Sequence, residues 1–123
     1  MAETRLVRTI VCAYGEELPT SWVQVFHRFE RAVERAGLRI RVRLLPLDDL
    51  PESFEVLVVP PDLERRARAL GTEARLVTTT RQRAPTAASE LMAELANGEL
   101  PLYAERVRPG EPKIVTHRGT DVR

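Results

Sequence analysis

The residues that could do chemistry gather near the start of the chain. The only cysteine, Cys12, ends an apolar run, and Thr20 and Ser21 follow at the start of an expected helix. Backbone N–H groups and the dipole at a helix start stabilise negative charge, and they can lower a cysteine pKa enough to make the thiol nucleophilic. Cysteine is also often buried as a small apolar side chain. Two interpretations of Cys12 therefore stay open, a reactive nucleophile and a core residue.

Other titratable side chains make weaker candidates. Glu16 and Glu17 could act as a general acid and base or bind magnesium, but adjacent loop residues rarely point at one target, so we favour a solvated acidic turn. His27 and His117 lie far apart in the sequence, without a carboxylate cluster beside them. A single cysteine cannot form an internal disulfide or a cysteine-based zinc site. We expect no metal ion and no other cofactor.

Composition indicates one small globular domain. The chain has 123 residues, 43% of them hydrophobic and 30% charged, with 19 basic residues against 18 acidic ones and a net charge of +1. This balance favours neither nucleic acid nor an anionic membrane as partner. No apolar run approaches the roughly 20 residues of a membrane span, and the first residues lack the layout of a secretory signal. We therefore expect a cytoplasmic protein without a membrane span.

Apolar, β-branched runs predict buried strands, and one strictly alternating run predicts a half-covered strand at a sheet edge. Its polar face carries Arg39, Arg41 and Arg43, and with no aromatic residue among them we interpret this face as solvated. Apolar residues at three- and four-residue spacing predict helices between the strands. The expected strands cover 6–13, 38–44, 54–59 and 74–79, and the expected helices cover about 21–36, 61–70 and 88–96.

The ends of the first helix carry their own signals. Ser21 with Gln24 three residues later predicts a capping box, with Thr20 as the other candidate cap. Gly37 predicts a left-handed stop at the carboxyl end. We therefore expect the helix to begin within reach of Cys12.

Alternating strands and helices predict an α/β fold with a mainly parallel sheet and helices on both faces. Right-handed crossovers give the strand order 2-1-3-4, and ligands in such sheets bind at the carboxyl ends of the strands, here the loops 12–21 and 60–62. We expect residues 1–98 to form this domain. Residues 99–123 are an extension, in which 102–107 and 113–117 form a hairpin or an arm that packs on another subunit.

A cysteine at the end of the first strand, a loop to Thr20 and Ser21 at a helix start, and a buried strand ending at Pro60 resemble the enzyme IIB components of the bacterial phosphotransferase system, of the lactose/cellobiose type. The resemblance covers about residues 6–98. It implies that Cys12 accepts a phosphoryl group from an enzyme IIA histidine and passes it to a sugar in the membrane component. It also implies that Gly15, Thr20 and Ser21 form the loop that binds the phosphate.

The loop differs from that family in its chemistry. It is about two residues longer, Gly15 is its only glycine, and Glu16 and Glu17 bring negative charge toward a group that is itself negative. A tyrosine-phosphatase loop is excluded because Leu18 stands where that chemistry needs arginine. A response-regulator receiver is excluded because Val59 and Pro60, not an acidic residue, end the third strand.

Two functions therefore remain open. The first is a thiol phosphocarrier that uses Cys12. The second, which we favour, is a non-catalytic binding or assembly module with a degenerate phosphate loop. Its partner would be another protein or a second copy of the chain, contacted through residues 99–123.

Overall fold

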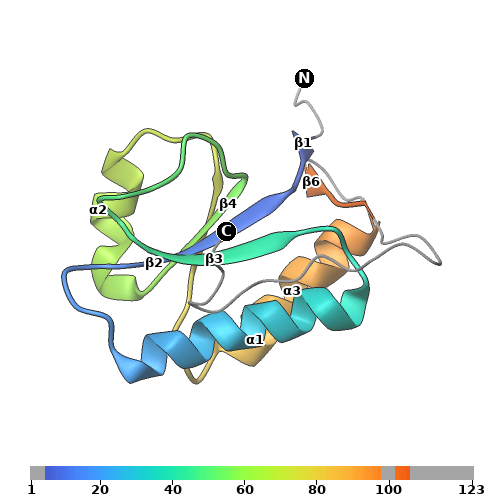
Figure 1. Cartoon of the computed structure of the whole chain (residues 1–123), viewed down its shortest axis with the longest axis horizontal. Helices are drawn as coiled ribbons and strands as arrows, with labels where there is room; N and C mark the ends of the chain where they lie inside the picture. Colours follow the sequence, from blue (N-terminus) through green and yellow to red (C-terminus); the bar gives the residue numbers. More distant parts are fainter. Residues whose placement is uncertain (1–4, 98–101, 106–123) are drawn as a thin grey trace, which may run out of the picture.

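The computed structural model describes residues 5–97 and 102–105. Arg5 and the residues after it form a series of strands and helices that alternate along most of the chain (Figure 1). In chain order the elements are β1 (Arg5–Leu6), β2 (Thr9–Tyr14), α1 (Thr20–Ala36), β3 (Arg41–Pro46), β4 (Val56–Val59), the 3₁₀ helix η1 (Pro61–Leu63), α2 (Glu64–Ala69), β5 (Arg75–Thr78), α3 (Ala84–Asn97) and β6 (Leu102–Tyr103).

The main sheet of the described residues has four parallel strands in the order β3-β2-β4-β5. This confirms the predicted order 2-1-3-4, with the first long strand in the middle. In the register of the sheet, Cys12 lies opposite Leu44 on one side and Val58 on the other. Every residue of β4 is buried, as its continuous apolar run predicts.

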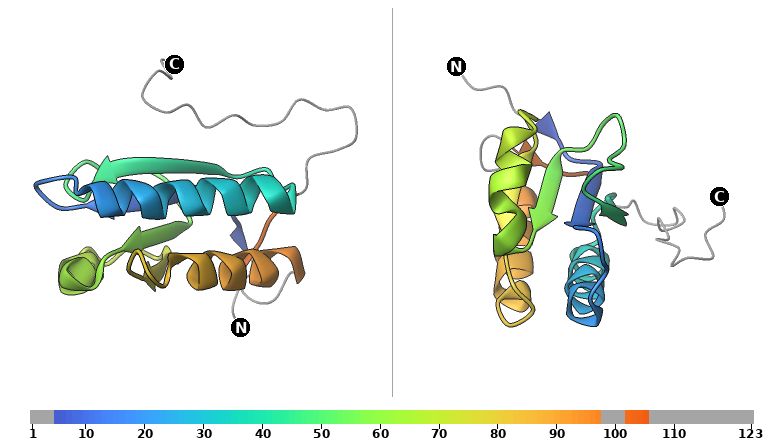
Figure 2. Two further views of the ribbon diagram at one scale, coloured as in Figure 1. Left: turned by 90° about the horizontal axis from the view of Figure 1, so that it is seen from below. Right: turned by 90° about the vertical axis from the view of Figure 1, so that its left-hand side faces the viewer.

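Helices cover both faces of this sheet, as predicted. Figures 1 and 2 show α1 and α3 side by side on one face and α2 on the other. Because side chains alternate along a strand, each central strand contributes to two separate apolar clusters. The α1/α3 cluster includes Ile10, Cys12, Val42, Val56 and Val58, and the α2 cluster includes Val11, Ala13, Leu57, Val59, Leu63 and Ala67.

Helix α1 buries the apolar stripe predicted from its spacing, which consists of Trp22, Val25, Phe26, Phe29 and Val33. The predicted capping box is wrong. Pro19 is the N-cap, no side chain caps the helix, and the Pro19 carbonyl accepts the N–H groups of Trp22 and Val23. Because both hydroxyl residues already lie inside the first turn, neither can occupy the cap position. At the other end, Gly37 has φ 67° and confirms the left-handed stop.

The strand predicted over 6–13 is divided into β1 and β2 by Val7 and Arg8. The carboxylate of Glu55 accounts for the break, because its Oε1 accepts the N–H groups of Arg8 at 2.7 Å and Thr9 at 2.9 Å. These two backbone donors are satisfied by a side chain, so they do not need a neighbouring strand at this point.

Strand β6 returns to the start of the chain. It pairs in parallel with β1, with Arg5 opposite Leu102 and Leu6 opposite Tyr103, and the N–H of Arg39 donates to the Glu105 carbonyl at 2.6 Å. Part of the expected extension is thus hydrogen bonded to the α/β domain. The strand expected over 113–117, and with it the hairpin, lies outside the described residues. Among those that are described, no helix has the length and apolar character needed to cross a membrane.

Candidate functional site

Cys12 lies inside β2 rather than at its end, because the strand continues to Tyr14. Its side chain belongs to the α1/α3 cluster, where Trp22 and Val58 are also buried, and its exposed fraction is 0%. Burial raises the pKa of the Cys12 thiol far above its ordinary value, and the charge of Glu30 raises the pKa further. At neutral pH the sulfur is therefore a neutral thiol covered by the core.

The other predicted site residues lie in the loop after β2 and in the first turn of α1, and they do not share the buried surroundings of the Cys12 sulfur. Thr20 and Ser21 are exposed in the first turn of α1, and Glu16 and Glu17 are exposed before it. Gly15 is half-buried, and a Cβ built there would contact the Leu63 side chain at an ordinary 3.6 Å. The position of Gly15 therefore does not demand glycine.

The backbone of this loop lacks the conformation that cradles an anion. A nest of inward N–H groups combines right-handed and left-handed residues in succession. Among the described residues only Gly37 and Gly71 have positive φ, and neither belongs to the loop. The segment from Gly15 to Pro19 is thus not a phosphate nest.

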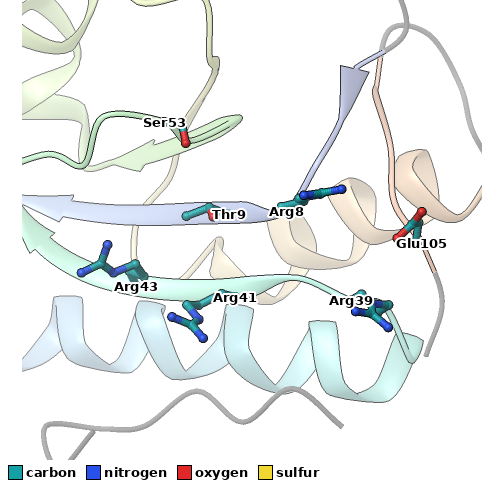
Figure 3. Close-up of a pocket in the computed structure, with 7 residues that line it drawn as sticks. All are labelled: Arg8, Thr9, Arg39, Arg41, Arg43, Ser53 and Glu105. Atoms are coloured by element: carbon teal, nitrogen blue, oxygen red, sulfur yellow. The ribbon is translucent and has the colours of Figure 1, made fainter. Parts of the chain in front are cut away.

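A second feature lies at the opposite end of the sheet, near the amino ends of β2, β3 and β4. It is an open pocket of about 370 Å³ lined by Arg8, Thr9, Arg39, Arg41, Arg43, Ser53 and Glu105 (Figure 3). The register places Thr9 of β2 opposite Arg41 of β3 and Val11 opposite Arg43. Arg41 and Arg43 share a strand face with Leu45, which packs against the α2 cluster, so both guanidinium groups lie on the α2 side of the sheet.

Three of the pocket arginines carry charge that no acidic side chain of the described residues balances by an ion pair. Several arginines outside the pocket form ion pairs with acidic side chains, namely Arg66 with Asp48, Arg68 with Glu64 and Arg75 with Glu94. Within residues 5–97 and 102–105, the guanidinium groups of Arg8, Arg41 and Arg43 have no such partner. Sequence analysis found the shared face of Arg39, Arg41 and Arg43 but missed the pocket. Arg8 and Ser53, which precede β2 and β4, reach it only because these strands lie beside β3 or beside its neighbour in the sheet.

The histidine and the carboxylates do not assemble a metal site in the part of the chain that the structure describes. No group of three or more histidine, cysteine, aspartate or glutamate side chains is placed to hold a metal ion there. His27 Nδ1 instead lies 2.8 Å from Glu30 Oε1 along α1. His117 lies outside the described residues.

Neither the family models nor the curated proteins that were compared with this sequence give a match.

Proposed function

We propose that this chain is a non-catalytic binding module built on an enzyme IIB-like α/β fold, in which Cys12 is a core residue. The full burial of the Cys12 side chain carries this proposal. The alternative function, a thiol phosphocarrier, uses the same cysteine as a covalent acceptor. The two functions therefore differ in one measurable property, the accessibility of a single sulfur atom.

Phosphoryl transfer between two proteins needs a close approach. The sulfur and the phosphorus of the donor must come within about 3–3.5 Å of each other with the leaving nitrogen in line. With an exposed fraction of 0%, Cys12 meets a phosphohistidine of another protein only if the packing of α1 and α3 opens. The raised pKa of the Cys12 thiol also keeps the nucleophilic thiolate scarce at neutral pH.

The loop supports the same conclusion. A phosphocysteine would carry between one and two negative charges, which need donors close by. The loop from Gly15 to Pro19 has no left-handed residue to turn N–H groups inward, and Glu16 and Glu17 add negative charge in that loop. We therefore assign the loop to the connection between β2 and α1 and not to catalysis.

For the module's partner we propose another protein or a second copy of this chain, in the cytoplasm. The proposed contact, residues 99–123, lies mostly outside the described residues. Of the part that is described, Glu105 bonds through its carbonyl to the start of β3, which joins this end of the chain to the domain.

The thiol provides the test. The native protein is treated with a thiol reagent at neutral pH, and separately with a phosphorylated enzyme IIA, and each product is weighed by intact mass spectrometry. We expect modification of Cys12 only after unfolding and no phosphoryl transfer. The matched control is the double variant Cys12→Ala/Ser21→Cys, whose single cysteine sits at an exposed position and should react at once.

Two outcomes would contradict the proposal. One is rapid alkylation of Cys12 in the native protein. The other is an added phosphoryl group that the Cys12→Ser substitution abolishes, which would establish the phosphocarrier.

A further inference from the structure

Four arginine side chains line one pocket at the edge of the main sheet. Arg41 and Arg43 come from alternate positions of β3, Arg39 lies two residues before β3, and Arg8 lies directly before β2 (Figure 3). Positions two apart on a strand are separated by roughly 6.6 Å, so the guanidinium groups of Arg41 and Arg43 are close enough to act on one ligand. Strand pairing fixes the backbones of Arg41 and Arg43. The N–H of Arg8 donates to the Glu55 carboxylate, and the N–H of Arg39 donates to the Glu105 carbonyl.

The balance of charge in the pocket is positive. Two carboxylates are near the four guanidinium groups. Glu105 is part of the lining, and Glu55 is held by the N–H groups of Arg8 and Thr9. Arg8, Arg41 and Arg43 have no ion-pair partner in the described parts of the chain. A ligand that carries more than one negative charge complements these three guanidinium groups.

The lining matches phosphoryl groups in its donors as well as in its charge. Guanidinium groups donate pairs of N–H bonds to phosphate oxygens, and the hydroxyls of Thr9 and Ser53 add further donors. Among the described residues that line the pocket, no side chain is aromatic, so these residues offer a nucleic acid base no stacking platform. A volume of about 370 Å³ suits a small ligand.

We propose that this pocket binds a small ligand with at least two phosphoryl groups, recognised through its phosphates alone. This inference deepens the proposed function and rests on it, because it gives the binding module a ligand. The site is separate from Cys12 and from the loop after β2, since it lies at the amino ends of the strands and not at the carboxyl ends. The ligand does not react there, and no covalent step is involved.

Calorimetric titration with inorganic triphosphate tests the site, with orthophosphate and adenosine triphosphate in parallel. We expect triphosphate to bind and orthophosphate to bind at least about tenfold more weakly, because a single phosphoryl group engages fewer guanidinium groups. Adenosine triphosphate and inorganic triphosphate should bind alike. Their affinities should fall together as salt is added, since the contacts are charged and exposed.

Matched variants locate the binding. Arg41→Gln with Arg43→Gln should weaken triphosphate binding by at least about tenfold. The control, Arg31→Gln with Arg65→Gln, removes the same charge at exposed positions outside the pocket and should change the affinity by less than about twofold. Glu105→Gln should tighten binding, because it removes a carboxylate from the lining but leaves the carbonyl that accepts the Arg39 N–H.

Three results would overturn the inference. They are the absence of triphosphate binding, an equal loss of affinity in the control pair, and binding of the nucleotide without binding of inorganic triphosphate. Circular dichroism of each variant shows that it is folded. The thiol reactivity of Cys12 is measured independently, so a failed pocket and a failed proposed function give different results.

Discussion

The buried thiol should make the stability of this protein depend on alkaline pH in a way that one substitution removes. Cys12 is fully buried, and burial, followed by the charge of Glu30, raises the pKa of its thiol. In the unfolded chain the thiol titrates near its ordinary pKa, about 8.5. Above that pH the unfolded state loses a proton that the folded state keeps. Ionisation then favours unfolding, so the stability from this group is complete below the unfolded pKa and is lost as the pH rises.

The size of the effect follows from linkage. Between the unfolded and folded pKa of the thiol, the free energy of unfolding falls by about 1.4 kcal/mol for each pH unit. From about pH 7 to about pH 10 this amounts to a loss of about 2 kcal/mol. Cys12→Ala removes the titration and costs about 1 kcal/mol through the small cavity that it leaves. The variant should therefore be less stable near neutral pH and more stable above about pH 9, because the two effects then have opposite signs.

Urea denaturation of the wild type and Cys12→Ala at a series of pH values, under reducing conditions, measures this difference. Comparing the two proteins removes the contributions of tyrosine and lysine, which titrate in both. Parallel stability curves from neutral to alkaline pH would refute the reasoning, because they would show that the thiol titrates alike in the folded and unfolded chain.

Three further predictions concern the packing and the backbone. Phe29→Ala should lower the free energy of unfolding by about 3–5 kcal/mol in a denaturant titration, because Phe29 is fully buried, whereas Leu18→Ala, at a side chain 42% exposed, should change it by less than about 0.5 kcal/mol. Gly37→Ala should lower the free energy of unfolding by about 1–2 kcal/mol, because φ is 67° there, and Gly15→Ala should lower it clearly less. Equal shifts of the melting temperature in the two variants would contradict the assignment of the left-handed turn to Gly37. Trp22→Phe should cost less than about 1 kcal/mol by thermal melting, because within the described residues the buried indole N–H has no hydrogen-bond partner to lose.

The parallel sheet was predictable from the residue pattern of its strands. A continuous apolar run fits a central strand, and an alternating run fits a strand at the edge. The run 56–59 is apolar throughout and forms the buried β4, whereas 38–44 alternates and contributes to the edge strand β3. The helix predicted after Pro19 buries the predicted side of its surface, because the apolar residues on that side, which include Phe29, recur at helical spacing.

The state of Cys12 was not predictable from its neighbours. Both faces of β2 are covered, so an apolar run around a cysteine has the same composition whether the sulfur faces a crevice or a core. The continuation of the strand to Tyr14 and the packing of α1 and α3 decide between the two, and both depend on residues far along the chain.

The pocket escaped sequence analysis for a related reason. Arg41 and Arg43 alternate with apolar residues, and this spacing alone indicates only a strand face that is exposed to solvent. Arg8 joins them because Glu55, 47 residues later, holds the backbone at the break between β1 and β2. The sequence around Arg8 does not indicate this hydrogen bond, because the two residues meet only through the register of the strands.

The pairing of β1 with β6 sets the order in which the molecule can be completed during synthesis. The main sheet has all its strands once Thr78 has been made, but Arg5–Leu6 must wait for Leu102–Tyr103. A growing chain therefore carries Arg5–Leu6 without this partner until Leu102–Tyr103 has been made. Among the strand pairs of the described residues, this one joins the segments that lie farthest apart in the sequence, so it has the longest loop to close.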